Sequence, residues 1–304
     1  MMDIIEELNI DDLKESLELV RKVFMEFEAP DYKKEGIASF FKFANYENIY
    51  KKLGEDLKIL VAKNNNKIVG MIAFSNYKHI VLLFIDKEYQ RRGIGTKLIN
   101  KVKDYCIKNN ENIEYITVNS SPFAKEFYHN LGFKDTDLDD EVDGIKFTPM
   151  QILPYTFTEY KDEYFEKLYN MKKECFKWYV EKIYGPWKDD IQIEFLNDLI
   201  NKHRNDIKVI KYKNEIIGLF TNYLISDKEN EINLFYIDKK YQNSGIGKNI
   251  LTNMLMTDKE RKVDTVLQVF KENPARFLYK KFGFEVYEET ETHYKMKRKV
   301  IKDE

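Results

Sequence analysis

The feature that most constrains the fold of this chain is an internal repeat with a period of about 152 residues. Segment 79–95 reads HIVLLFIDKEYQRRGIG, and segment 231–247 reads EINLFYIDKKYQNSGIG. Further along, FYHNLGF at 127–133 is matched by LYKKFGF at 278–284. A period this long indicates the duplication of a whole domain, because solenoid repeats are only 20 to 45 residues long.

The length of the chain agrees with two domains. It has 304 residues, of which 43% are hydrophobic and 34% are charged, an ordinary balance for a globular protein. A single hydrophobic core usually stops growing near 250–300 residues, so two cores are expected. We expect an N-terminal domain at 1–152 and a C-terminal domain at 153–304.

Composition and charge argue against several classes of protein. The net charge is −2 and the isoelectric point is about 6.2, so the basic footprint of a nucleic-acid-binding protein is missing. Apolar runs such as 80–85 are too short to span a bilayer, and the acidic start after Met1 and Met2 is unlike a signal peptide. We therefore expect a cytoplasmic protein without nucleic-acid or membrane partners. With four histidines and no C-x-x-C or H-E-x-x-H motif, no metal site is expected.

Each half carries the same order of expected elements. A strand and an amphipathic helix come first, with Leu13, Leu17 and Val20 at helical spacing in the first half. A β-hairpin follows, with turns expected at 64–66 and 213–214. An apolar central strand, a glycine-containing loop, a helix, a strand, a short helix and a last strand complete the half. This order predicts an α/β (α+β) fold of two similar domains, each a mixed, mainly antiparallel sheet flanked by helices.

The loop after the central strand carries the strongest chemical signal. It reads QRRGIG at 90–95 and QNSGIG at 242–247, and each copy joins an apolar strand to a helix. The start of a helix exposes unpaired N–H groups and a partial positive charge, and glycine lets the backbone approach an anion closely. The loop therefore predicts a phosphate or pyrophosphate site in each half. Its spacing fits neither a Walker A loop nor a Rossmann fingerprint.

The motif Gln-x-x-Gly-x-Gly after an apolar strand, followed by a tyrosine and Gly-Phe, resembles the GNAT superfamily of N-acyltransferases. The resemblance covers both halves and implies acetyl-CoA as co-substrate. It also implies that the glycine loop binds the pyrophosphate of CoA and that the preceding strand lies beside pantetheine. The implied CoA-binding residues are Phe84, Ile85, Gln90, Arg91, Arg92, Gly93, Gly95 and Thr96 in the first half, and Tyr236, Ile237, Gln242, Asn243, Ser244, Gly245, Gly247, Lys248 and Asn273 in the second.

The same resemblance implies that the tyrosine before Gly-Phe is the general acid that protonates the leaving thiolate. It would be Tyr128 in the first half and Tyr279 in the second. The second half keeps the family's asparagine six residues before this tyrosine, at Asn273, whereas the first half has Pro122 there, with Asn119 as its possible replacement. The alternative reading of each tyrosine is a half-buried core aromatic.

Acyl transfer also needs a base, because a lysine-like amine with a pKa of about 10.4 is protonated at pH 7. His79 and Glu231 occupy equivalent positions at the start of the two central strands. Histidine titrates near neutral pH, whereas Glu231 would need a raised pKa or a relay water. The alternative for both is a solvent-facing residue at the entrance of a strand.

We expect the acceptor amine to bind between the first helix and the hairpin, where the two halves differ most. Segment 26–36, followed by Phe40, Phe41 and Phe43, mixes carboxylates with aromatic rings, and so does segment 178–190. Such walls suit a cationic amine through charge and cation–π contacts.

Three functions stay open at this point. The first is an acetyl-CoA-dependent N-acetyltransferase, in which a primary amine of a small molecule or peptide attacks the thioester directly. In the second, one half is a non-catalytic CoA-binding or scaffolding module; the second half, with Asn273, looks more complete, and the first keeps the more basic loop. The third is a CoA sensor without turnover. The acceptor, the active half and the choice between monomer and homodimer are left open.

Overall fold

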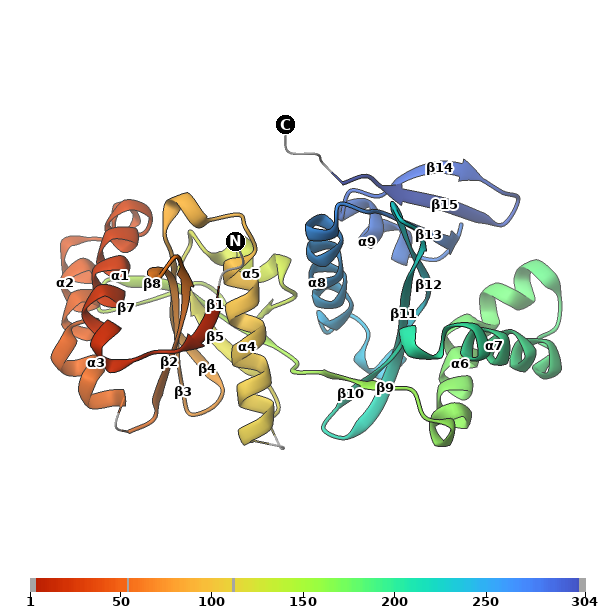
Figure 1. The fold of residues 1–304 in the computed structure, drawn as a ribbon, viewed down its shortest axis with the longest axis horizontal. Coiled ribbons are helices and arrows are strands. Elements are labelled where there is room, and N and C mark those ends of the chain that lie inside the picture. The colour runs from red at the N-terminus through yellow and green to blue at the C-terminus, as the bar shows by residue number, and fades with distance from the viewer. Residues whose placement is uncertain (1–3, 54, 111–112, 301–304) are drawn as a thin grey trace. The chain divides into compact units, whose positions relative to one another are not determined.

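The computed structural model describes residues 4–53, 55–110 and 113–300. The start of the chain, on which the expectation about a signal peptide rests, lies outside the described residues. The chain divides into two compact units, Met1–Pro154 and Tyr155–Glu304 (Figure 1). Across the described ranges, no helix is both long enough and apolar enough to cross a bilayer.

In the first unit, one sheet lies between two layers of helices (Figure 1). Its elements in chain order are β1 (Ile4–Glu7), α1 (Leu13–Phe27), α2 (Lys34–Phe43), α3 (Tyr46–Leu53), β2 (Leu57–Asn64), β3 (Lys67–Ser75), β4 (His79–Ile85), α4 (Ile94–Asn109), β5 (Ile116–Ser120), α5 (Lys125–Asn130), β6 (Lys134–Asp135), β7 (Asp140–Val142) and β8 (Ile145–Ile152). The strand order is β1-β2-β3-β4-β5-β8-β6, with β7 on β8. Strands β4 and β5 are parallel, and the other pairs are antiparallel.

Two apolar clusters hold this sheet between its helices. Helices α1, α2 and α3 pack on one face, where Phe24 of α1 is fully buried and stacks on Phe40 of α2 with ring centroids 3.7 Å apart. Helices α4 and α5 pack on the other face, through residues such as Leu98 and Val102. Truncating a buried aromatic such as Phe24 to alanine typically costs about 3–5 kcal/mol. The two clusters therefore fix the end of α1 and the start of α4, which are the two places where the site is built.

The second unit repeats this plan. Its elements are β9 (Thr156–Glu159), α6 (Phe165–Tyr184), α7 (Asp189–His203), β10 (Ile207–Tyr212), β11 (Glu215–Ser226), β12 (Glu229–Ile237), α8 (Ile246–Arg261), β13 (Asp264–Phe270), α9 (Ala275–Lys281), β14 (Glu285–Glu289) and β15 (His293–Arg298). The strand order is β14-β15-β13-β12-β11-β10-β9, and β12 pairs with β13 in parallel. Both units are mixed, mainly antiparallel sheets flanked by helices, which confirms the expected fold class.

The hairpin turns follow the local chemistry that their residues predict. Asn65 and Asn66 have φ of 50° and 63°, and Lys213 and Asn214 have φ of 45° and 64°. Two-residue hairpin turns of the favoured type need positive φ at both central positions, and asparagine tolerates this conformation well. These tight turns set the register of β2 on β3 and of β10 on β11.

Candidate active site

The two parallel strands at the centre of each sheet separate partway along their length. Among the described residues, β4 pairs with β5 only at His79–Thr117 and Ile80–Val118. In the second unit, the parallel pairs run from Glu229–Asp264 to Ile232–Leu267. Beyond these pairs, the carboxyl-terminal halves of β4 and β12 have no strand partner on this side in the described part of the chain. Backbone N–H and C=O groups on such an edge can bind an extended ligand.

At the end of the central strand, the glycine loop has the same backbone in both units. Gly93 has φ of 81° and is the N-cap of α4, and Gly245 has φ of 91° and is the N-cap of α8. Arg91 and Asn243, two residues earlier, also have positive φ, at 60° and 58°. Among the described residues, neither of these N-caps makes a side-chain hydrogen bond to the start of its helix. The loop therefore presents backbone N–H groups at the positive end of a helix, as an anion site requires.

The glutamine of each loop has a positioning role inside the protein. The side-chain amide of Gln90 donates to the carbonyl of Ile85 at 3.1 Å, and that of Gln242 donates to the carbonyl of Ile237 at 2.8 Å. Each bond ties the loop to the last residue of the central strand. The two glutamines thus hold the loop in place through their side chains rather than aiming them at a ligand.

Other loop side chains differ in how far they could reach a ligand. Arg91 and Arg92 are exposed, and the guanidinium of Arg92 lies over the ring of Tyr89 at 4.9 Å. Thr96 is buried, and the Ser244 hydroxyl donates to the carbonyl of Tyr241 at 2.6 Å. The two arginines therefore offer the first loop a charge that the second loop lacks at the matching positions, Asn243 and Ser244.

The strand residues expected beside pantetheine turn their side chains into the core. The Tyr236 hydroxyl donates to the carbonyl of Leu168 at 2.9 Å, and the Phe84 ring lies 5.9 Å from the ring of Phe40. The side chain of Ile85 lies so near Gly70 that a Cβ at that glycine would be 2.7 Å from its Cδ1. Ile237 is also buried. The backbones of these residues face the gap between the strands, while the Phe84 side chain also lines the pocket described below.

The two candidate acids occupy matching places on short helices. Tyr128 of α5 is 3% exposed, and Tyr279 of α9 is 7% exposed. Burial, and to a lesser extent the charge of Glu28, raises the pKa of Tyr128, and burial raises the pKa of Tyr279 to about 12. Both phenols keep their proton near neutral pH, which a general acid must do.

The start of each short helix is capped by a different residue. The Asn273 side chain accepts a hydrogen bond from the N–H of Ala275 at 2.9 Å. In the first unit the Ser121 hydroxyl accepts from the N–H of Ala124 at 3.3 Å. Ser121, rather than Asn119 in β5, thus makes the contact that Asn273 makes in the second unit, and the replacement expected at Asn119 stays a prediction.

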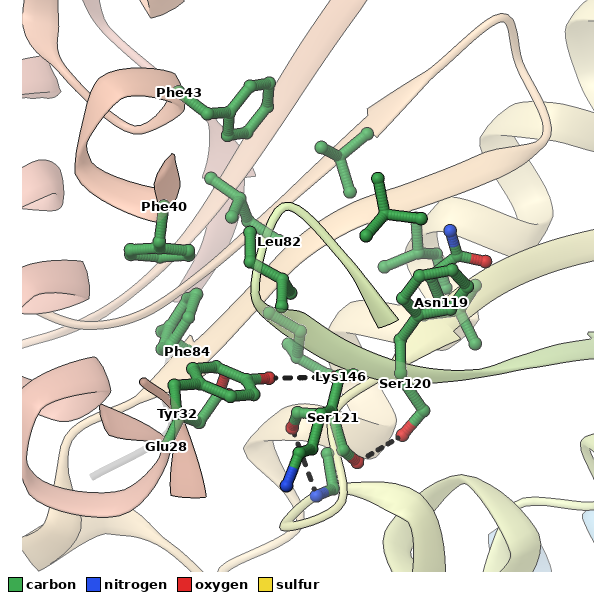
Figure 2. Close-up of a pocket in the computed structure, with 18 of the residues that line it drawn as sticks. Glu28, Tyr32, Phe40, Phe43, Leu82, Phe84, Asn119, Ser120, Ser121 and Lys146 are labelled. Carbon is green, nitrogen blue, oxygen red and sulfur yellow. Dashed lines mark hydrogen bonds between the residues drawn. The ribbon is translucent and has the colours of Figure 1, made fainter. Parts of the chain in front are cut away.

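A pocket of about 410 Å³ opens beside Tyr128 in the first unit (Figure 2). Its walls come from the end of α1, from α2, β4 and β5, and from the hairpin of β7 and β8. Figure 2 shows aromatic rings from α2 and β4 on one side, with Ser120 and Ser121 across from them. Residues lining the pocket include Glu28, Tyr32, Phe40, Phe43, His79, Leu82, Phe84, Asn119, Ser121, Tyr128, Asp143 and Lys146.

The two residues expected to act as bases have different surroundings. His79 lines the pocket, and its Nδ1 lies 2.9 Å from the Thr117 hydroxyl. Burial, followed by the charge of Lys78, lowers the pKa of His79, so its ring is neutral at pH 7. Glu231 pairs in register with Tyr223. The pKa of the Tyr223 phenol is raised to about 12, mainly by burial of the phenol and then by the charge of Glu231.

One residue in the pocket was underrated by sequence reasoning. Glu28, at the end of α1, was expected only as part of an acceptor-binding wall. Burial raises the pKa of Glu28 to about 7, although hydrogen bonding by the Ser121 side chain opposes the shift. A carboxyl group that titrates near neutral pH can take up and release protons under working conditions. The only sequence signal for it was its place among aromatic residues after an amphipathic helix.

Other residues expected in the acceptor walls lie elsewhere. Glu26 forms an ion pair with Lys87, and the Phe41 ring packs under Arg21 outside the pocket lining. In the second unit, Asp189 accepts hydrogen bonds from the Trp187 indole at 3.0 Å and from Lys173 at 2.7 Å. The contact between Lys173 and Asp189 therefore ties α6 to α7, and the acceptor wall expected at 178–190 stays a prediction.

Comparisons with known proteins agree with this geometry. An acetyltransferase (GNAT) domain model matches residues 28–154, and an acetyltransferase (GNAT) family model matches residues 165–284. An uncharacterized N-acetyltransferase of Methanocaldococcus jannaschii is 34% identical over 140 residues, which are 42% of this chain and 59% of the relative. The ribosomal protein bS18–alanine N-acetyltransferase of Haemophilus influenzae is 30% identical over 131 residues, 43% of this chain and 81% of the relative.

Among solved structures, the PaiA N-acetyltransferase of Thermoplasma acidophilum in complex with coenzyme A is 22% identical, with a TM-score of 0.42. The match covers 49% of this chain and 98% of that structure. The family models cover most of both units, each with one match. The chain belongs to the GNAT acetyltransferase family and carries two of its domains in tandem.

Proposed function

We propose that this chain is an acetyl-CoA-dependent N-acetyltransferase that moves an acetyl group to a primary amine by direct attack on the thioester. The observation that carries the proposal is a constellation found in each unit: a gap between two parallel strands, a glycine loop at a helix start and a buried tyrosine. We assign one such site to each of the domains 1–152 and 153–304.

The residues present fit acetyl-CoA. The open helix starts after Gly93 and Gly245 suit a pyrophosphate, and Arg91 and Arg92 add positive charge in the first domain. The unpaired edge of the central strand suits the amides of pantetheine. When bound, acetyl-CoA supplies an acetyl group activated as a thioester. Gly95 and Gly247 would contribute their backbone N–H groups, and Lys248 would contribute a positive charge.

Different residues would donate and accept the protons of the reaction. Tyr128 and Tyr279, which keep their protons near neutral pH, would each donate one to the leaving thiolate of their own domain. His79 is neutral at pH 7 and lines the pocket, so it can accept a proton there. Holding both substrates in one narrow pocket would supply much of the rate, because correct positioning removes an entropic barrier.

A second candidate is that only one domain works while the other binds CoA without turnover. A specific difference favours it: the position 152 residues after Glu28 is Val180, so the second domain lacks this carboxylate. Glu231 of the second domain has Tyr223 as its cross-strand neighbour. These observations favour the first domain as the working half, although the sequence motifs alone favoured the second.

The test is a thiol-release assay with acetyl-CoA and a panel of primary amines, including peptides with free N-termini. The wild type is compared with Tyr128→Phe and Tyr279→Phe. Loss of the working acid should lower kcat by about 100-fold, within the usual range for general acid catalysis. Release that fails with every amine, while the chain still binds acetyl-CoA, would reject the enzyme and leave a CoA-binding sensor.

A further inference from the structure

We propose that Glu28 binds the ammonium group of the acceptor in the first domain and takes its proton, and that this acceptor carries its amine on an apolar stem. The proposal rests on the proposed acetyltransferase function and adds a catalytic residue and a substrate class to it.

The first argument for this proposal is the position of Glu28 in the fold. It is the C-cap of α1, and the chain turns there into the short 3-10 helix η2 (Ala29–Asp31). Its carboxylate lines the pocket that Tyr128 also lines, and its charge acts on the phenols of both Tyr128 and Tyr32. Figure 2 shows Glu28 next to Tyr32, below Phe84. An amine held by Glu28 would therefore lie in the same pocket as the proposed acid.

The charges around Glu28 leave it in need of a cation. Asp31 from its own segment adds a second negative charge, and Ser121 is its hydrogen-bonding neighbour across the pocket. From the other walls, His79 is neutral at pH 7, and Asp143 and Lys146 belong to the hairpin of β7 and β8. In the part of the chain that the structure describes, no lysine or arginine forms an ion pair with Glu28. Burying a carboxylate without such a partner is costly, and an ammonium ligand would remove that cost.

Titration agrees with the geometry. Burial raises the pKa of Glu28 to about 7, which makes it a stronger base than an ordinary carboxylate. The pKa of His79 is lowered by burial, and its Nδ1 already lies against the Thr117 hydroxyl. Glu28 thus combines the negative charge that attracts an ammonium with the basicity needed to deprotonate it. His79, being neutral, offers only the second.

The walls beside Glu28 indicate the rest of the acceptor. Phe40 and Phe43 of α2 and Leu82 and Phe84 of β4 line the pocket, and Figure 2 shows them grouped on one side of it. Apolar walls favour a stem that buries apolar surface, at roughly 25 cal/mol per Å². A second ammonium group pressed against these four apolar side chains would lose its hydration there, because the other acid of the lining, Asp143, lies exposed in the β7–β8 turn. The pocket therefore selects a monoamine over a polyamine.

The protons of the reaction then balance. The ammonium gives one proton to the Glu28 carboxylate, and the neutral amine forms the new C–N bond to the acetyl carbon as the C–S bond breaks. Tyr128 gives its proton to the departing sulfur, and its phenolate takes the second proton from the nitrogen that becomes the amide. Glu28 releases its proton to solvent, so the net products are the amide, the thiol and one proton.

The test compares Glu28→Gln with Glu18→Gln, an exposed position on the same helix, both in a Tyr279→Phe background so that turnover reports on the first domain. The readouts are kcat/KM for 2-phenylethylamine and spermidine between pH 5.5 and 9.5, and calorimetric binding of each amine without acetyl-CoA. We expect the background chain to prefer 2-phenylethylamine at least about tenfold and to show a rising limb near pH 7. Glu28→Gln should lose that rising limb. Its kcat/KM should fall at least about 100-fold, as expected for loss of a general base. Its amine affinity should fall at least about tenfold, as expected for loss of a charged hydrogen bond.

Acetyl-CoA affinity should be unchanged in Glu28→Gln, which separates loss of the carboxylate from misfolding. The proposal is overturned if Glu28→Gln keeps the rising limb and the amine affinity of Glu18→Gln, or if spermidine is the better acceptor. A wild-type chain that acetylates none of the panel would instead count against the proposed function. Even then, the calorimetric comparison of the two variants would decide whether Glu28 binds an ammonium group.

Discussion

Tyr128 and Glu28 line one pocket, and the charge of Glu28 adds to burial in raising the pKa of the Tyr128 phenol. The phenol is thereby kept protonated, while the carboxyl itself titrates near pH 7. When two titratable groups in one site have pKa values this far apart, the group with the lower pKa can act as the base and the other as the acid. The pair also has a consequence for stability that can be measured without any substrate.

The first prediction concerns pH and the stability of the first domain. The pKa of Glu28 is raised from 4.5 to about 7 in the folded chain, so the folded state binds more protons than the unfolded state between these values. The contribution of Glu28 to the free energy of unfolding therefore falls as pH rises from about 4.5 to 7, and the loss is complete above pH 7. Glu28→Gln should be more stable than wild type by about 1–3 kcal/mol at pH 8.5 and similar to it at pH 4.5.

Urea denaturation can follow the two domains separately. Both tryptophans, Trp178 and Trp187, are in the second domain, so their fluorescence reports on that domain alone, whereas far-UV circular dichroism reports on both. We expect Glu28→Gln to shift a transition seen by circular dichroism and to leave the fluorescence transition in place. An equal stability change at pH 4.5 and 8.5 would contradict burial of an ionising carboxyl group as the cause.

The second prediction concerns the contact that closes one side of the pocket. A Cβ added at Gly36 of α2 would lie 2.0 Å from the carbonyl oxygen of Gly144, in the turn between β7 and β8. Gly36→Ala must push this hairpin away, which should cost about 1–3 kcal/mol, as overpacking usually does. Because Asp143 and Lys146 of the hairpin line the pocket, KM for the amine should rise more than KM for acetyl-CoA.

Steady-state kinetics and circular dichroism on Gly36→Ala and on Lys34→Ala check this. Lys34 is exposed in the first turn of the same helix, so its truncation should change neither the KM values nor the stability of the first domain. Equal increases in both KM values would show that the hairpin does not shape the amine site in particular.

The third prediction counts CoA sites. Gly93 and Gly245 have φ of 81° and 91°, and an alanine in this left-handed region costs about 1–2 kcal/mol, so the loop should distort. Native mass spectrometry should find two CoA molecules on the wild type, one on either single Ala variant and none on the double variant. Gly283→Ala is the matched control, since Gly283 also has positive φ, at 81°, but lies outside both loops. Two bound CoA molecules on every variant would mean that these loops do not hold the nucleotide.

Local patterns predicted the parts of the site that depend on neighbouring residues. The period of 152 located both glycine loops, and their strand-to-helix position followed from the apolar runs on either side. The positive φ of Gly93 and Gly245 follows from the same rule, because glycine alone adopts it without cost. The mixed sheet also followed from the order of elements. Each of these features follows from neighbouring residues or from the order of elements along the chain.

What could not be predicted depends on contacts between distant segments. The pKa of Glu28 is raised because α1 ends against the loop around Ser121, about 90 positions later, and no local pattern encodes that burial. In the same way, the resemblance implied that Gln90 binds CoA, but its bond to the Ile85 carbonyl could not be predicted from the sequence. Asp189 belongs to the carboxylate-rich segment expected to meet an amine, and its bonds to Lys173 and Trp187 could not be predicted from that segment alone. Sequence reasoning thus found the residue types and missed which of them were already partnered.

The last prediction concerns a buried polar cluster in the second domain. Asp258 of α8 accepts hydrogen bonds from the Asn230 amide at 3.2 and 3.1 Å and from the Thr265 hydroxyl at 2.8 Å, and burial raises its pKa. The position 152 residues earlier is Cys106, which packs in an apolar cluster. Asp258→Ala leaves two buried donors without an acceptor, at about 1–3 kcal/mol each, and opens a cavity.

We therefore expect Asp258→Ala to lower the free energy of unfolding of the second domain by about 2–5 kcal/mol, read from the tryptophan fluorescence transition in urea. Asp258→Asn keeps one acceptor oxygen and should lose less. Thr257→Ala, exposed on the same helix, should stay close to wild type. Because the cluster joins α8 to the start of β12 and β13, its loss should also weaken CoA binding in the second domain while leaving the first site filled. A fluorescence transition that stays in place would mean that water replaces the carboxylate as the acceptor for Asn230 and Thr265.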